Sequence, residues 1–278
     1  MKRAIDAGRV ALPRALVQQG VDVARALGCS VVSLGQYTSI ITGHGTRLLD
    51  RGMSMTTGNS FSIALAIQAI DRSHAARGSD SRELSLAIVG AAGNIGRMCA
   101  MLLGRRYRRV VLMGSGRPGS MRRLRAVATT IPEAMVTVDR SALGDADVVV
   151  LAVNDVTAPF GPGDFGQSAI VCDLSIPAGI HSTLAAARPD LDVIAGGIAQ
   201  LPRRENLNID GFRLPPGLVY GCLAEGILLG LEHARESSYT GVLTADHIAR
   251  MARIADRHGF ELADTPSLAE PTGRLLTI

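Results

Sequence analysis

Short, continuous apolar runs alternate with helical patterns between residues 84 and 195 of the chain. Runs of this kind, when they alternate with helices, are typical of parallel strands that are buried on both faces of a sheet. The predicted strands are Leu84–Val89, Val110–Met113, Ala134–Val138, Val148–Val153, Ala169–Cys172 and Val193–Ala195, and the predicted helices among them include Ile95–Leu103 and Pro118–Thr129. The pattern predicts an α/β fold with a Rossmann-type doubly wound parallel sheet.

The pattern is less regular before residue 80 and after residue 200. Outside the sheet, the predicted elements are helix over residues 1–30 with a break at Pro13, a buried strand at Ser30–Gly35, polar turns at residues 36–39 and 53–60, and helices at Phe61–Ser73, Cys222–Arg235 and Ala245–His258. We therefore expect a second, smaller α/β domain beside the sheet, together with C-terminal helices.

The composition is that of a globular protein with a sizeable core. Of the 278 residues, 47% are hydrophobic and 19% are charged, and the mean hydropathy is +0.22. No unbroken apolar run reaches the roughly 18 residues that a membrane helix needs. The N-terminus lacks the apolar stretch of a signal peptide. We expect a cytoplasmic protein, and the apolar composition leaves peripheral contact with a membrane open.

A glycine motif, Gly90-Ala91-Ala92-Gly93-Asn94-Ile95-Gly96, directly follows one predicted strand and opens a helix. In this context Gly90 permits a tight turn, Gly93 lets the backbone approach a pyrophosphate, and Gly96 lets the helix pack on the sheet. The phosphates of a dinucleotide would lie at the helix N-terminus. The predicted cofactor-binding residues of this turn are Gly90, Ala92, Gly93, Asn94, Ile95 and Gly96.

The end of the next strand indicates which dinucleotide binds. Folds that prefer NAD place a carboxylate there for the ribose 2′-hydroxyl, but here Gly114-Ser115-Gly116-Arg117 follows. Ser115 can donate a hydrogen bond and Arg117 can pair with a 2′-phosphate, although Arg117 could also be an ordinary exposed arginine at a helix start. The sequence favours NADPH. Asn154 follows a later strand and is a predicted contact of the nicotinamide ribose.

Cys222 is the candidate nucleophile among four cysteines. The cysteines show neither CxxC pairing nor metal-ligand spacing, so we predict no metal site. Cys222 follows a turn and a short apolar run and stands at a predicted helix start. The helix dipole and unpaired N–H groups there favour the thiolate. We expect Cys29, Cys99 and Cys172 to be buried and inert.

Four stretches carry a resemblance to a known family. In order along the chain, they are Leu34–Ile40, Thr56–Ser60, Ala87–Gly96 and Tyr220–Glu225. Together they resemble the long-chain acyl-[acyl-carrier-protein] reductases, which make fatty aldehydes. In that family the cysteine of the last stretch is acylated by the substrate, so the resemblance gives Cys222 this role. Family members carry a longer N-terminal α/β portion, so we expect a substrate domain whose N-terminal part is either truncated or divergent.

The resemblance implies a mechanism. Cys222 would attack the acyl thioester of acyl carrier protein or coenzyme A, and NADPH would reduce the acyl-enzyme to an aldehyde. The candidate donors to the oxyanion are backbone N–H groups at the Cys222 helix start and the side chains of Thr38, Ser39, Thr57, Asn59 and Ser60. His44 would move a proton. Glu225 would either bind these loop donors or complement the helix dipole. We predict Cys222, Ser39, Asn59 and His44 as catalytic residues.

The charge pattern bears on the partner. The net charge is +4, the isoelectric point is about 9.2, and Lys2 is the only lysine. Few aromatic residues argue against base stacking with nucleic acid, whereas an acidic carrier protein suits an arginine-rich surface. We expect the arginines at residues 105–109 to lie in a solvated turn away from the carrier. The oligomeric state stays open.

The predicted organisation is part of a substrate domain at residues 1–80, an NADP-binding Rossmann domain at residues 81–200, and a C-terminal helical segment at residues 201–278. The last segment carries Cys222 and is expected to pack back on the substrate domain.

Three other interpretations remain open. Two are oxidoreductases of the shikimate-dehydrogenase and glutamyl-tRNA-reductase types, and the third is a non-catalytic module that binds NADP(H). A shikimate-type enzyme would need a Lys/Asp pair, and Lys2 lies too near the chain end to be convincing. A tRNA reductase would have its cysteine before the glycine motif, where only Cys29 stands.

Overall fold

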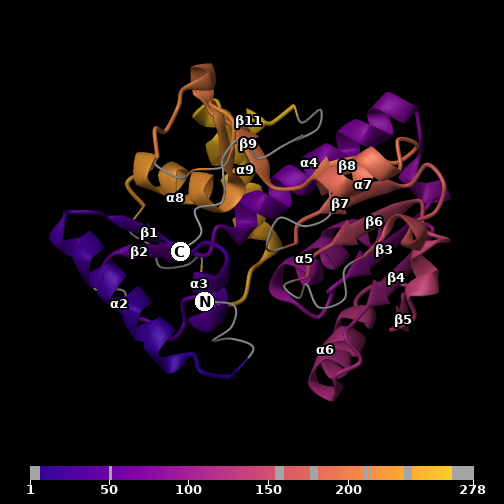
Figure 1. The fold of residues 1–278 in the computed structure, drawn as a ribbon, viewed down its shortest axis with the longest axis horizontal. Coiled ribbons are helices and arrows are strands. Elements are labelled where there is room, and N and C mark those ends of the chain that lie inside the picture. The colour runs from indigo at the N-terminus through magenta and orange to yellow at the C-terminus, as the bar shows by residue number, and fades with distance from the viewer. Residues whose placement is uncertain are drawn as a thin grey trace.

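A six-stranded parallel sheet forms the large lobe of the protein (Figure 1). The computed structural model describes residues 7–49, 52–153, 160–175, 181–209, 212, 214–234 and 240–264. The strands are β3 (Ser85–Val89), β4 (Arg109–Met113), β5 (Met135–Thr137), β6 (Val148–Leu151), β7 (Ile170–Asp173) and β8 (Asp192–Ala195). Their order is β5-β4-β3-β6-β7-β8, and every neighbouring pair is parallel. This order confirms the predicted Rossmann-type sheet, whose strand order reverses between β3 and β6.

Both faces of the sheet are buried, because successive side chains of each strand enter different cores. Leu86 and Ile88 join one core, whereas Ala87 and Val89 join the other. Helices α4 (Asn59–Arg77), α5 (Asn94–Leu103) and α6 (Pro118–Ala128) contribute to the first core, and α7 (His181–Ala187) contributes to the second. The continuous apolar strands of the sequence therefore reflect helices and connections on both sides.

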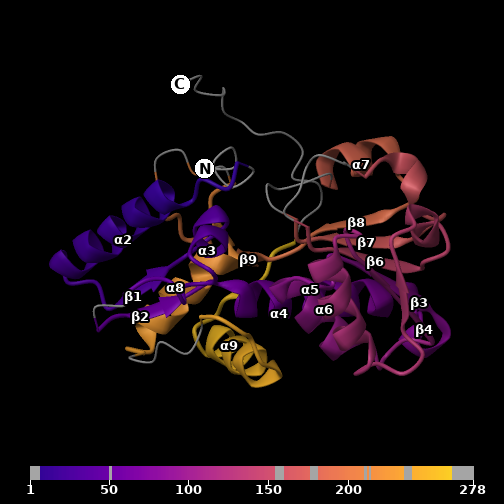
Figure 2. The same cartoon turned by 90° about the horizontal axis from the view of Figure 1, so that it is seen from below.

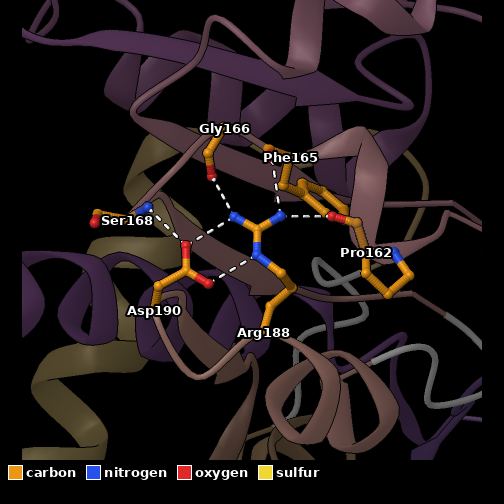
Figure 3. A network of polar contacts seen from close by, with 6 residues as sticks. All are labelled: Pro162, Phe165, Gly166, Ser168, Arg188 and Asp190. Carbon is orange, nitrogen blue, oxygen red and sulfur yellow. Dashed lines mark hydrogen bonds and ion pairs between the residues drawn. The ribbon is translucent and has the colours of Figure 1, made fainter.

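Arg188 ties together the connections at the β7–β8 edge of this sheet. Figure 3 shows its guanidinium donating to the carbonyl oxygens of Pro162, Phe165 and Gly166, at 2.7, 3.3 and 3.2 Å. The same group pairs with Asp190 at 2.7 Å, and this pairing holds the pKa of Asp190 well below its usual range. One arginine thus donates hydrogen bonds to three carbonyl oxygens of this connection, which would otherwise have to bind water.

The small lobe is built on two short parallel strands, β1 (Val31–Ser33) and β2 (Ser54–Thr56). Helix α2 (Ala11–Ala26) packs against them through Val21, beside Met53 and Met55. The short helix α3 (Tyr37–Ile41) follows β1.

The small lobe corrects three predictions. Pro13 does not break α2, because it lies in the first turn, where backbone N–H groups have no partner within the helix. Residues 37–39, predicted as part of a polar turn, belong to α3, and residues 53–60, also predicted as a turn, include β2 and the start of α4. Elements of three to five residues are too short to show a period in the sequence.

The C-terminal segment adds a small antiparallel sheet and two helices. The strands are β9 (Ile198–Gln200), β10 (Leu218–Tyr220) and β11 (Glu261–Leu262), in the order β10-β9-β11, and the helices are α8 (Gly221–Leu231) and α9 (Ala245–Arg257). Helix α8 packs on β1 and β2, and α4 packs on both α8 and α9. Figure 2 shows α4 extending from α8 toward α5, so that one helix joins the two lobes. The sequence did not predict this sheet.

Short 3-10 helices lie in the connections, at η1 (Ser81–Glu83), η2 (Arg140–Leu143), η3 (Pro162–Asp164) and η4 (Pro202–Arg204). Within the described ranges, every helix is too short or too polar to cross a lipid bilayer.

Candidate functional site

The glycine turn has the geometry of a dinucleotide site. Gly90 has a φ of +81°, and a side chain there would overlap the carbonyl oxygen of Ala152, which follows β6. A side chain at Gly96 would overlap the carbonyl group of Gly90. At Gly93, the residue before α5, an added Cβ would meet only Gly90 O, at 3.2 Å, and glycine has no side chain to cap the helix. The turn therefore leaves room for a pyrophosphate at the first N–H groups of α5.

The other predicted cofactor residues differ in burial and in whether their side chains are free to bind a ligand. Ala92 and Ile95 are half-buried in the glycine turn, whereas Ser115 and Arg117 are exposed past the end of β4. Asn94 uses its side chain elsewhere, since its amide donates to the carbonyl oxygen of Gly241 at 2.9 Å. One N–H of this amide is thus already used within the protein. Asn154 lies outside the described residues.

Cys222 lies where the carboxyl ends of both parallel sheets meet. The residue before it, Gly221, donates its N–H to the carbonyl oxygen of Gly197 at 2.7 Å, and Gly197 follows β8. On the other side, a Cβ on Gly35 would lie 3.4 Å from Cys222 Sγ, and a Cβ on Gly58 would overlap Cys222 Cα. Gly35 and Gly58 stand two residues beyond the ends of β1 and β2. Cys222 thus packs against both glycines, and at Gly58 the contact is so close that only a residue without a side chain fits.

Hydroxyl groups from the small lobe fix this arrangement. Ser33 donates to the carbonyl oxygen of Cys222 at 2.6 Å, and Thr38 donates to the carbonyl oxygen of Gly35 at 2.6 Å. Neither contact was predicted, because both depend on segments that are distant in sequence or on local loop geometry.

Glu225 connects the thiol-bearing helix to the loop after β2. It lies one turn beyond Cys222 and is fully buried. One carboxylate oxygen accepts the N–H of Phe61 at 2.7 Å, and the other accepts the hydroxyl of Thr56. Thr56 in turn accepts the N–H of Gly58 at 2.9 Å. Glu225 therefore binds donors near this loop, but they are the hydroxyl of Thr56 and the backbone N–H of Phe61, and not the side chains considered from the sequence.

Burial changes the ionisation of both groups. It raises the pKa of Glu225 to about 7, although the Thr56 hydroxyl and the N–H of Phe61 oppose the rise. It also raises the pKa of the Cys222 thiol to about 11, and the charge of Glu225 adds to this effect. The backbone N–H of Leu223 lowers the thiol pKa by less. The prediction that the helix start favours the thiolate is therefore wrong, because desolvation of the thiol outweighs the effect of the helix N-terminus.

We expect Glu225 to make the protein less stable as the pH rises. Its folded pKa of about 7 exceeds the ordinary value of 4.5. The folded state therefore binds this proton more tightly, and the resulting stability is present below pH 4.5 and lost as the pH passes 7. Between pH 5 and 8 the loss is about 2–3 kcal/mol.

Urea unfolding of the wild type and of Glu225→Gln at both pH values measures this loss. The variant lacks the titrating proton, whereas both proteins keep His44 and His74, so the difference between them isolates Glu225. Equal pH dependence in the two proteins would contradict the buried, titrating carboxyl.

His44 and Ser39 form a pair on the loop that includes α3. The two side chains meet at 3.1 Å between His44 Nδ1 and Ser39 Oγ, and burial lowers the pKa of the imidazole. The carbonyl oxygen of His44 accepts the N–H of Gly241 at 2.8 Å, and Gly241 also accepts the amide of Asn94. The His44 loop is therefore attached to the glycine turn, and its imidazole is neutral at neutral pH.

The predicted catalytic residues other than Cys222 lie on two segments, each of which contacts Cys222 through a glycine. Asn59, largely buried, follows Gly58 directly and so stands beside the Cys222 backbone. Ser39 and His44 belong to the loop that begins at Gly35.

The remaining cysteines confirm one prediction and correct another. Cys99 and Cys172 are buried as predicted, and burial raises the pKa of both thiols. Cys29 is exposed, contrary to the prediction, because it follows the C-terminal turn of α2 instead of entering β1.

No family model matches the chain. Among curated proteins, the aminotransferase PigE of Serratia sp. (strain ATCC 39006) is 24% identical over 267 residues, which cover 93% of this chain and 31% of that protein. The chain thus spans about a third of the length of this relative.

Solved structures show weaker similarity. Shikimate 5-dehydrogenase from Listeria monocytogenes is 12% identical with a TM-score of 0.32, and the match covers 46% of this chain and 52% of that one. The A chain of dipicolinate synthase from Bacillus subtilis is 13% identical with a TM-score of 0.38, over 57% and 53% of the two chains. At these scores, the function has to be argued from the site itself.

Proposed function

We propose that the chain is a nicotinamide-dependent oxidoreductase that reduces a fatty acyl thioester to a fatty aldehyde through an acyl-Cys222 intermediate. One observation carries this proposal. Cys222 stands at a helix start that is bonded to Gly197, at the carboxyl edge of the sheet whose glycine turn fits a dinucleotide. A thiol in that place suits covalent capture of an acyl group beside a hydride donor.

NADPH is the proposed cofactor. The turn from Gly90 to Gly96 would hold its pyrophosphate, and Ser115 and Arg117 would face the adenosine ribose phosphate past the end of β4. When bound, it supplies the hydride that reduces the acyl group.

The chain's own residues supply the acyl transfer. Because the Cys222 thiol is protonated at rest, a base must remove its proton, and the neutral imidazole of His44 is the proposed group. Cys222 Sγ forms a bond to the acyl carbon while the bond to the carrier sulfur breaks. His44 then returns the proton to the departing carrier thiolate. Reduction of the acyl carbon would be followed by breakage of its bond to Cys222 Sγ, which releases the aldehyde and leaves a thiolate that takes up a proton from water.

Aminotransferase activity is not proposed for this chain. Pyridoxal-phosphate enzymes form a Schiff base with a lysine, and the only lysine here is Lys2. The candidate site offers a cysteine in place of such a lysine.

Intact-protein mass spectrometry tests the proposal. The protein is incubated with a long-chain acyl-coenzyme A, or with the matching acyl carrier protein, and then with NADPH. We expect a mass gain of one acyl group, located at Cys222 by peptide mapping, which NADPH discharges to aldehyde faster than NADH does. An adduct confined to the exposed Cys29, or no adduct from either carrier, would contradict the proposal and favour a module that only binds NADP(H).

A further inference from the structure

Two hydroxyl groups on the segment that packs against Cys222 have no partner among the described residues. Thr57 Oγ1 and Ser60 Oγ are buried, in residues that are 1% and 0% exposed, and neither makes a hydrogen bond within the part of the chain that the structure describes. Nearly all buried polar groups in folded proteins are hydrogen-bonded, so two orphans in one short segment call for an explanation. A ligand group that arrives during the reaction would satisfy both.

The position of these hydroxyls points to the reacting atoms. Thr57 and Ser60 stand on either side of Gly58 and Asn59, and Gly58 lies directly against Cys222. This segment begins at the carboxyl end of β2 and runs into the first turn of α4. An acyl group on Cys222 Sγ would therefore form next to it.

Most other donors near the thiol are already occupied. Thr56 and the N–H of Phe61 bind Glu225. Thr38 donates to Gly35 and Ser33 donates to Cys222 itself. Ser39, a further candidate from the sequence, is paired with His44.

We propose that the hydroxyls of Thr57 and Ser60 donate hydrogen bonds to the carbonyl oxygen of the acyl group at Cys222, and to the oxyanion that this oxygen becomes. The inference rests on the proposed function. When Cys222 Sγ bonds to the acyl carbon, the C=O electron pair moves onto oxygen, and it returns when the carrier sulfur leaves. Donors already fixed in a dry site stabilise that charge without having to reorganise.

Stability and rate should respond in opposite directions, which separates this role from a structural one. Removing an unsatisfied buried hydroxyl relieves a desolvation penalty. We therefore expect Thr57→Val and Ser60→Ala to keep or raise the Tm. Each should slow acylation of Cys222 about 100-fold, as is typical for the loss of one oxyanion donor.

Ser54→Ala is the matched control. Ser54 is a buried hydroxyl residue in the adjoining strand β2, but it has a partner, since it donates to the carbonyl oxygen of Ala234 at 2.7 Å. This variant should lower the Tm and leave the acylation rate unchanged. Thr57→Ser keeps the hydroxyl and should restore most of the rate that Thr57→Val loses.

The measurements are the Tm and the time course of the acyl adduct on Cys222, with a long-chain acyl-coenzyme A as the probe. Wild-type acylation rates in both Thr57→Val and Ser60→Ala would overturn the oxyanion role while leaving the acyl-enzyme intact. A Tm that falls together with the rate would also overturn it, because the hydroxyls would then be structural. Absence of any adduct on the wild type would overturn the proposed function, and this inference with it.

Discussion

Replacing Cys222 by alanine is expected to reduce acyl-thioester-dependent NADPH oxidation at least about 10³-fold, because the variant has no atom that can hold the acyl group. Dinucleotide binding should persist, since the glycine turn belongs to the other lobe and its contacts do not involve the thiol. Steady-state absorbance at 340 nm and a separate titration of NADPH binding measure the two properties. The expected pattern is lost turnover with unchanged cofactor affinity.

Cys29→Ala is the matched control, because it removes an exposed thiol from the same chain. It should turn over like the wild type. Retained turnover in Cys222→Ala would show that hydride reaches the thioester without a covalent intermediate, and the acyl-enzyme mechanism would then be discarded.

Gly58→Ala is expected to have the largest effect on stability, with a loss of at least about 3 kcal/mol in the free energy of unfolding. Two penalties combine at this position. Gly58 has a φ of +70°, which L-residues rarely adopt, and the new Cβ would overlap the Cα, Cβ and carbonyl oxygen of Cys222. Backbone atoms cannot rotate away as a long side chain can, so α4 and α8 would have to separate. Urea unfolding measures the loss.

Gly78→Ala separates the two penalties. Gly78 ends the same helix with a φ of +61°, but an added Cβ there meets nothing within 4 Å. This variant should cost about 1–2 kcal/mol, the price of the left-handed conformation alone. Similar losses of stability in the two variants would mean that the segment at Gly58 can move away from Cys222. That outcome would contradict a close, fixed contact between Gly58 and Cys222.

The large lobe was predictable because its signals are long and local. Strands such as Leu84–Val89 are continuous apolar runs, and their alternation with helices has few solutions other than a doubly wound sheet. The glycine turn was equally predictable, because the strand-to-helix turn leaves no space for a side chain at Gly90 or Gly96. Boundaries differed from the structure by one or two residues at most elements, as at β3 (Ser85–Val89).

The small lobe was less predictable because its strands are only three residues long. Strand β2 and helix α3 lie where the sequence shows polar turns. Their positions are set by tertiary contacts: β2 packs against α2 and α8, and α3 packs against α2. The contacts of Gly35 and Gly58 with Cys222 join segments that are more than 160 residues apart. A contact between segments so far apart in sequence cannot be predicted from a local sequence pattern.

The thiol illustrates a second kind of limit. Its place at a helix start could be read from the chain, and that place alone argues for a low pKa. The burial of Cys222 and the enclosed carboxylate of Glu225 reverse the sign. Desolvation is a property of the folded surroundings, so the sequence could locate the nucleophile without giving its resting protonation state.

The spacing of one helical turn between Cys222 and Glu225 has a consequence for how charge is shared. The ionised carboxyl disfavours the thiolate, and by reciprocity the thiolate disfavours the ionised carboxyl. The first negative charge therefore settles on the carboxyl, and the second, on the sulfur, is harder to place. Removing the carboxylate charge, as Glu225→Gln does, should lower the pKa of the Cys222 thiol and so speed its reaction with an alkylating agent at a given pH.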